Sequence, residues 1–218
     1  SNLGSLLMAA GLPYDSDAGY GMCGAITALL HGAANLTSAE MAQVVGPFEG
    51  YTANREPFLR VMQMHRDAVE QINPVGPAYL KDAARSLWDD VVSLGKRFGY
   101  RNAQATVLAP TGTISIIADC SAGIEPLYGI HLVRTVMDGM TLSSLHPAFV
   151  QHADRHGLAL SSLQRDLEQS PSIQHLTQLP DSLRQLFVTA HDVSPSHHVR
   201  MQAAFQRHSD SGVSKTIN

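Results

Sequence analysis

The sequence contains little cysteine, few charged residues and no long apolar run. Its two cysteines among 218 residues, Cys23 and Cys120, are too few for a disulfide scaffold and indicate a reducing compartment, the cytoplasm. Charged residues make up 16% of the chain and the formal net charge is −4, so no basic surface for nucleic acid is expected. No apolar run is long enough to span a membrane. The sequence therefore predicts a cytoplasmic protein that binds neither nucleic acid nor membranes.

Hydrophobic residues account for 44% of the chain, which is typical of a globular protein rather than a disordered one. The 218 residues suffice for one sizeable core or for part of a larger domain. Residues 1–4 read as the inside of an apolar helix, and residues 214–218 as the inside of a strand. We therefore expect a piece of a longer protein, produced by excision or by truncation.

Apolar residues recur at helical spacing along most of the chain. They predict helices over residues 3–11, 17–31, 35–45, 55–72, 78–98, 146–156, 162–168, 180–190 and 195–208. A capping box at residues 37–40 is expected to belong to the start of the third helix, and Asn54 is expected to cap the fourth. β-prone runs predict strands over 105–108 and 213–217, and residues 127–136 are expected to be extended.

The clearest linker is residues 74–77, which contain two prolines and a glycine. It separates a helical part, residues 1–73, from residues 78–218, which hold a central loop and the closing helices and strand. Helix 78–98 followed by strand 105–108 is half of a β/α crossover unit. The predicted fold class is therefore α/β and rich in helix.

The central loop follows the run 105–108. Pro110 has no N–H to donate, so it ends the strand. Gly112 is expected to adopt a positive φ and to let a ligand approach the backbone. Loop N–H groups beside threonine hydroxyls suit an anion such as a phosphate ester, and without a lysine the pattern is not a P-loop. An ordinary strand-to-helix turn is the alternative. The predicted phosphate-binding residues are Pro110, Thr111, Gly112, Thr113 and Ile114.

Four other side chains are candidates for a site. Glu125 follows a turn near the loop and is either a functional carboxylate or a hydrogen-bonded structural acid. Cys120 lies between the loop and that turn, but no second cysteine is near enough in sequence for a redox pair. His152 and His156 have the i, i+4 spacing of metal ligands, yet no HExxH glutamate accompanies them, which favours surface histidines. No metal site is predicted.

Several segments together resemble one enzyme family. Ala-Pro-Thr-Gly-Thr-Ile-Ser at 109–115, followed by Gly-Ile-Glu-Pro at 123–126, resembles the large catalytic chain of ribonucleotide reductases, most closely the adenosylcobalamin-dependent class II. Further segments that resemble this family are residues 11–16, 200–206 and 213–218. The resemblance extends over essentially the whole chain.

The resemblance implies a segment of the ten-stranded α/β barrel of these enzymes, in which loop 110–114 holds the substrate's phosphates. The family's radical cysteine lies in an Asn-x-Cys-x-Glu motif, and neither Cys23 nor Cys120 has that context. No catalytic residue is therefore expected here. The reducing cysteine pair, the main cobalamin contacts and any allosteric region are also expected elsewhere in the enzyme.

For the complete enzyme, the resemblance implies reduction of ribonucleoside diphosphates by cobalamin-initiated thiyl-radical chemistry. The implied partners are the substrate, the rest of the catalytic chain and further copies of it in a homo-oligomer. Two rival hypotheses remain. One is a non-catalytic remnant that binds nucleotides or other subunits, which the missing radical cysteine supports. The other is a metal-binding module built on His152 and His156.

Overall fold

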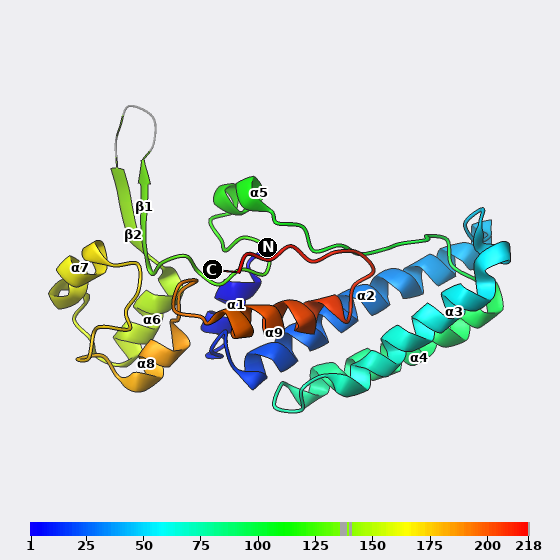
Figure 1. Cartoon of the computed structure of the whole chain (residues 1–218), viewed down its shortest axis with the longest axis horizontal. Coiled ribbons are helices and arrows are strands. Elements are labelled where there is room, and N and C mark those ends of the chain that lie inside the picture. Colours follow the sequence, from blue (N-terminus) through cyan, green and yellow to red (C-terminus); the bar gives the residue numbers. More distant parts are fainter. Residues whose placement is uncertain (136–138, 140, 218) are drawn as a thin grey trace. The chain divides into compact units, whose positions relative to one another are not determined.

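The computed structural model describes residues 1–135, 139 and 141–217. Helices dominate this part of the chain (Figure 1). The elements are α1 (Leu3–Ala9), α2 (Asp17–Val45), α3 (Tyr51–Ala68), the 3₁₀ turn η1 (Val69–Gln71), α4 (Ala78–Phe98), α5 (Gly112–Ile117), β1 (His131–Thr135), β2 (Thr141–Leu145), α6 (Pro147–Arg155), α7 (Leu160–Gln169), α8 (Asp181–Leu186) and α9 (Pro195–Gln206). No helix among them combines the length and the apolar character that crossing a membrane requires.

Two compact units interleave along the chain. Unit 1 comprises residues 1–16, residues 110–198 and the end of the chain from Lys215, and unit 2 comprises residues 17–109 and 199–214. The linker proposed at 74–77 is therefore a connection inside unit 2, between η1 and α4.

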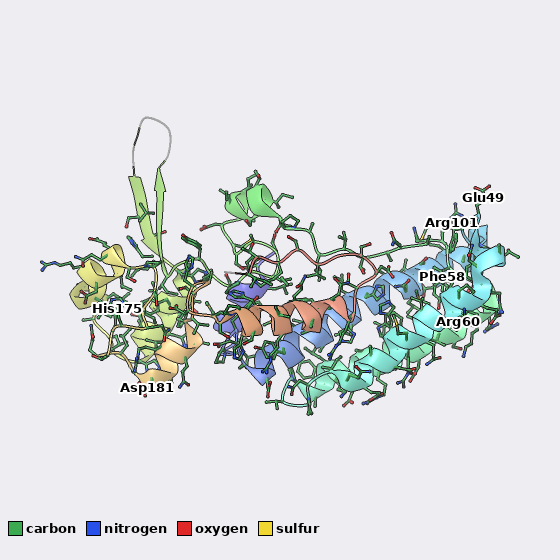
Figure 2. The ribbon with its side chains drawn as sticks, in the orientation of Figure 1. Glu49, Phe58, Arg60, Arg101, His175 and Asp181 are labelled. Atoms are coloured by element: carbon green, nitrogen blue, oxygen red, sulfur yellow. The ribbon has the colours of Figure 1, made fainter. Side chains whose placement is uncertain are left out.

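The core of unit 2 is built by α2, α3 and α4, which lie side by side (Figure 1). Small residues on α2 let α4 approach closely: a Cβ at Gly32 would lie 2.9 Å from the Leu87 side chain. The indole of the fully buried Trp88 donates a hydrogen bond to the Ala28 carbonyl at 2.9 Å. In the first half of α3, the ring of Phe58, which is labelled in Figure 2, packs against the aromatic rings of Phe48, Tyr51 and Tyr100.

The prediction of two helices over 17–31 and 35–45 was wrong, because α2 continues without a break for 29 residues. The capping box at 37–40 lies inside it. Its serine serves tertiary structure instead, since the Ser38 hydroxyl accepts a hydrogen bond from the Asn102 N–H at 2.8 Å. The Ser38 carbonyl also accepts from the Arg101 N–H at 2.9 Å. Both bonds fasten the segment that leaves α4 to the middle of a continuous helix.

The predicted cap at Asn54 was also wrong. Helix α3 begins at Tyr51, three residues earlier than Asn54, with Gly50 as its N-cap. The Asn54 side chain donates to the Gly50 carbonyl at 2.9 Å from within the first turn. Burial of Tyr51, which is 4% exposed, explains the earlier start, because it anchors the first turn in the aromatic cluster.

Residues 105–108 and 213–217 were expected to be strands, but they do not form strands. Leu108 and Val213 make a single parallel bridge, flanked by a hydrogen bond from the Ser214 N–H to the Leu108 carbonyl at 2.9 Å. The Ala105 N–H is instead taken by the Asp210 carboxylate at 2.6 Å. A strand needs a ladder on at least one side, and the described residues supply a single rung. They contain no barrel.

Unit 1 contains the one sheet described by the structure, the antiparallel pair β1 and β2 (Figure 1). β1 confirms extended chain over 131–135, and Val136, the last residue of the run expected to be extended, lies outside the described residues. The core beneath is formed by apolar faces of α6, α7 and α8 with Met8 of α1. Phe149 and Phe187, both fully buried, meet edge to face with centroids 5.3 Å apart.

Candidate functional site

The predicted phosphate loop lies in unit 1 and leads directly into α5. Its positive φ is at Thr111 (φ 53°, ψ 34°) rather than at Gly112, so the expected conformation of Gly112 was wrong. A threonine tolerates the left-handed region only when its surroundings hold it there. Here the Thr111 hydroxyl accepts a hydrogen bond from the Gly123 N–H at 2.7 Å, which ties the loop to the Gly-Ile-Glu-Pro turn.

Three backbone N–H groups of the loop precede the first hydrogen bond of α5. That bond runs from the Ser115 N–H to the Thr111 carbonyl at 2.9 Å. The amides of Gly112, Thr113 and Ile114 therefore lie in the first turn of α5, where N–H groups have no partner within the helix. The left-handed Thr111 followed by helical residues is the backbone arrangement that makes an anion-binding concavity. Gly112, Thr113 and Ile114 are exposed, and a Cβ added at Gly112 would meet nothing within 4 Å, so there is open space beside the loop.

Residues 119–126, which follow α5, form a turn that is held by residues on either side of α1. The Asn2 N–H donates to the Ser121 carbonyl at 2.8 Å, and the buried Tyr14 hydroxyl donates to the Ile124 carbonyl at 2.7 Å. α1 approaches so closely that a Cβ at Gly4 would lie 2.1 Å from the Glu125 carbonyl oxygen. Only glycine fits at that position without displacing the turn.

Glu125 has both carboxylate oxygens engaged within unit 1. One accepts a hydrogen bond from the Thr216 N–H at 2.7 Å, and the other pairs with the ammonium of Lys215. The Lys215 side chain is fully buried and that of Glu125 is 24% exposed. This pair joins the Gly-Ile-Glu-Pro turn to the Ser-Lys-Thr-Ile segment. Sequence reasoning missed Lys215, since a single buried lysine gives no periodic signal.

A cavity of about 520 Å³ lies beside this turn. Its lining includes Asp119, Cys120, Glu125 and His146, but none of the loop residues 110–114. The loop adjoins this lining, because the Thr111 hydroxyl is hydrogen-bonded to the Gly123 N–H, and the preceding residue Ala122 lines the cavity.

The groups in the cavity wall differ in what they can do. Cys120 is half-buried and forms no disulfide. Burial lowers the pKa of His146, with a smaller opposing effect from the Asp119 carboxylate. His146 is therefore a neutral imidazole at pH 7, able to donate or accept a hydrogen bond. The sequence predicted that a helix starts at His146, which is the N-cap of α6, but it did not predict the place of His146 in a cavity.

The cofactor that the resemblance implies does not fit this cavity. A volume near 520 Å³ takes one drug-sized ligand, such as a nucleotide. Adenosylcobalamin, with its corrin ring and nucleotide tail, is several times larger than a nucleoside. We therefore assign no residue of this chain to the cofactor.

Two groups of histidines bear on metal binding. His152 lies in α6 and His156 is its C-cap. Burial is the main cause that lowers the pKa of His152, and no third ligand joins the pair in the part of the chain that the structure describes. In unit 2, His31, His65 and Asp210 each bring one potential ligand atom to a common position. The spacing of His31, His65 and Asp210 in the sequence does not indicate that they lie together.

Comparison with known proteins gives concordant results. The sequence model of the family described as "Ribonucleotide reductase, barrel domain" matches residues 1–218. A vitamin B12-dependent ribonucleotide reductase of Rhodopirellula baltica is 46% identical over 229 aligned positions, covering 100% of this chain and 22% of that protein. A vitamin B12-dependent ribonucleoside-diphosphate reductase of Thermoplasma acidophilum is 43% identical over 118 positions, covering 54% of this chain and 15% of that protein.

Among solved structures, the class Id ribonucleotide reductase alpha subunit of Actinobacillus ureae superposes with a TM-score of 0.63 at 20% identity. The superposition covers 97% of this chain and 31% of that subunit, and it shows a shared fold. The chain spans about a fifth of the length of the Rhodopirellula relative. Because the family model matches residues 1–218, the chain belongs to the ribonucleotide reductase barrel-domain family.

Proposed function

We propose that this chain is a segment of the catalytic barrel of a cobalamin-dependent ribonucleotide reductase and supplies its substrate phosphate-binding loop. The observation that carries the proposal is the family match over residues 1–218, together with 46% identity to a relative named for its B12 dependence. The reaction of the complete enzyme is the conversion of ribonucleotides to deoxyribonucleotides. The name of the Thermoplasma relative supports diphosphates as the substrate class.

The loop 110–114 would hold the phosphates through the amides of Gly112, Thr113 and Ile114. These donors are fixed before the ligand arrives, because the hydrogen bond between Thr111 and Gly123 holds the loop in its left-handed conformation. Preorganised amides lose little entropy on binding and orient the ribose relative to reacting groups. The Thr113 hydroxyl is an additional donor at the exposed rim.

The cavity beside residues 119–126 would hold the nucleoside part of the substrate. Glu125 and Lys215 shape this wall through their ion pair, and Cys120 and His146 contribute polar groups to it. We propose no catalytic role for any of these residues. Catalytic residues, the reducing cysteines and the cobalamin contacts are assigned to the remainder of the complete enzyme, where the cofactor would supply the radical that initiates reduction.

The barrel to which this segment contributes would be completed by the rest of the catalytic chain. The isolated parallel β-bridge between Leu108 and Val213 supports that proposal, because it pairs two segments in the way that parallel strands pair. Neighbouring strands from the remaining chain would extend it into a sheet. We further propose a cytoplasmic enzyme that forms homo-oligomers, consistent with cysteines that form no disulfide.

The test is turnover by the complete gene product. Purified protein is given a ribonucleoside diphosphate, a dithiol and adenosylcobalamin, and deoxyribonucleotide is measured. Product that depends on cobalamin is the expected result. Absence of product from a folded, full-length protein that still binds nucleotide would overturn the proposal in favour of a non-catalytic, nucleotide-binding remnant.

A further inference from the structure

We propose that His31, His65 and Asp210 form a zinc-binding site in unit 2, separate from the phosphate loop and from ribonucleotide reduction. The three residues come from α2, from α3 and from the segment that follows α9. Their candidate ligand atoms all lie within 4.8 Å of one another. The residues are far apart in sequence and meet only because the helices of unit 2 pack together.

The spacing suits a tetrahedral ion. Zinc bonds to imidazole nitrogen and carboxylate oxygen are each close to ~2.1 Å, so two ligand atoms on a tetrahedron lie about 3.4 Å apart. His31 Nε2 and Asp210 Oδ1 are 3.5 Å apart. The rings of His31 and His65 meet edge to face with centroids 4.5 Å apart. The candidate ligand atoms lie no more than 4.8 Å apart, so ring movements of at most about 1.4 Å would bring every pair to the tetrahedral spacing.

Each candidate ligand has its other polar atom held by a fixed partner. His65 Nδ1 lies 3.3 Å from the Arg207 carbonyl, which leaves Nε2 for a metal. His31 Nδ1 lies 3.0 Å from the Thr106 hydroxyl and 3.0 Å from the Asn35 amide nitrogen, which is 3.5 Å from Nε2. Asp210 Oδ2 accepts the Ala105 N–H at 2.6 Å, which leaves Oδ1 toward His31. Protein zinc ligands are characteristically oriented by such outer partners.

The donor set of the cluster indicates which metal it would take. His31 and His65 are buried and each offers one ring nitrogen, and Asp210 offers one carboxylate oxygen. Two nitrogen donors and one carboxylate suit zinc better than magnesium or calcium, which prefer oxygen ligands.

A cavity of about 560 Å³ adjoins the cluster and provides both an entry path and an open coordination position. His65 and Asp210 line it, as do the polar side chains of Gln71, Gln104 and Gln206. Three protein ligands with a fourth position open to water is the arrangement of exchangeable or catalytic zinc sites rather than of closed structural ones.

A neighbouring histidine adds a second, independent indication of a missing partner. The buried Nδ1 of His208 has no hydrogen-bond partner among the described atoms. His31 and His65 both act electrostatically on this ring. A buried polar atom without a protein partner calls for water or an ion close by.

The test is metal titration of the complete chain after removal of metal by a chelator. We expect one Zn²⁺ per chain, and visible d–d absorption when Co²⁺ replaces it. Asp210→Asn, which keeps the size and removes the charge, and His65→Gln should each weaken binding by about 100-fold or more. The matched control His156→Ala should bind zinc like the original chain.

X-ray absorption of the zinc-loaded original chain tests the ligands without any variant. Two imidazoles and low-atomic-number donors in the first coordination shell are expected. No zinc binding by folded chain, a shell containing sulfur, or binding that survives in folded Asp210→Asn and is lost in His156→Ala would each overturn the proposal. In that event the contact of His31 with Asp210 is an ordinary imidazole–carboxylate hydrogen bond.

Discussion

Replacement of Gly112 by valine should separate phosphate binding from folding. The added Cβ meets nothing within 4 Å, and Gly112 is not at a positive φ, so the side chain introduces neither clash nor strain. Glycine and valine also differ little in helix propensity, so the free energy of unfolding should change by less than about 0.5 kcal/mol. The branches of valine would instead occupy the space through which a phosphate reaches the loop amides.

The expected loss of affinity follows from the hydrogen bonds removed. One hydrogen bond to a charged group contributes ~1.5–3 kcal/mol, so losing one amide contact weakens binding by about 10- to 100-fold. Calorimetric titration of the complete enzyme with a ribonucleoside diphosphate measures it, and urea unfolding checks the fold. A ribonucleoside without phosphates should bind both proteins equally.

Gly212→Val is the matched control, because a Cβ there also meets nothing within 4 Å and no positive φ is required. Its affinity for the diphosphate should equal that of the original enzyme. Unchanged diphosphate affinity in Gly112→Val would refute the assignment of the loop. An equal loss in both variants would show that valine acts through something other than exclusion from the loop.

Three further predictions concern stability. Gly4→Ala places a Cβ against the Glu125 carbonyl and should cost about 1–3 kcal/mol in urea unfolding, whereas a cost near zero would mean that α1 does not press on the turn. Lys215→Met leaves a half-buried carboxylate without its partner and should cost about 2 kcal/mol, less than for a fully buried pair, with Glu125→Gln in the same background expected to recover part of it. Burial lowers the pKa of His31 and His208 to about 4, below the unfolded value. The unfolded state therefore binds protons first, and the free energy of unfolding should fall from pH 6.5 to pH 4 by up to about 3 kcal/mol per histidine. A flat profile in chemical denaturation over that range would contradict the buried, neutral assignment.

Helical periodicity correctly predicted the helices whose first and last residues are set by their own sequence. Residues 78–98 form a helix with the predicted limits, because the apolar stripe faces α2 and Gly99 (φ 77°) ends the helix. The break expected within α2 failed for a tertiary reason. Ser38 is a good capping residue in isolation, but its hydroxyl is used by the Asn102 N–H. Local sequence contains no information about that distant donor.

The strands failed for a related reason. The run 105–108 has the composition of a strand, yet strand formation depends on neighbouring chain. Within the described residues its neighbour is Val213, and the Asp210 carboxylate takes the Ala105 N–H. The same aspartate contacts His31, so a single long-range residue both limits the strand and builds the histidine cluster.

The conformation of the loop 110–114 differs from the one that the sequence predicted. The loop is open to a ligand at Gly112, although the left-handed residue is Thr111. That difference arises because the Gly123 N–H holds the Thr111 hydroxyl. The Lys215 partner of Glu125 lies 90 residues away in sequence, so spacing could not reveal it.

The most direct measurement is a crystal structure of the complete enzyme with a ribonucleoside diphosphate bound. The account predicts phosphate oxygens within hydrogen-bonding distance of the amides of Gly112, Thr113 and Ile114, with the nucleoside directed toward the cavity beside Glu125. Phosphates bound at another part of the enzyme, with this loop unoccupied, would contradict it.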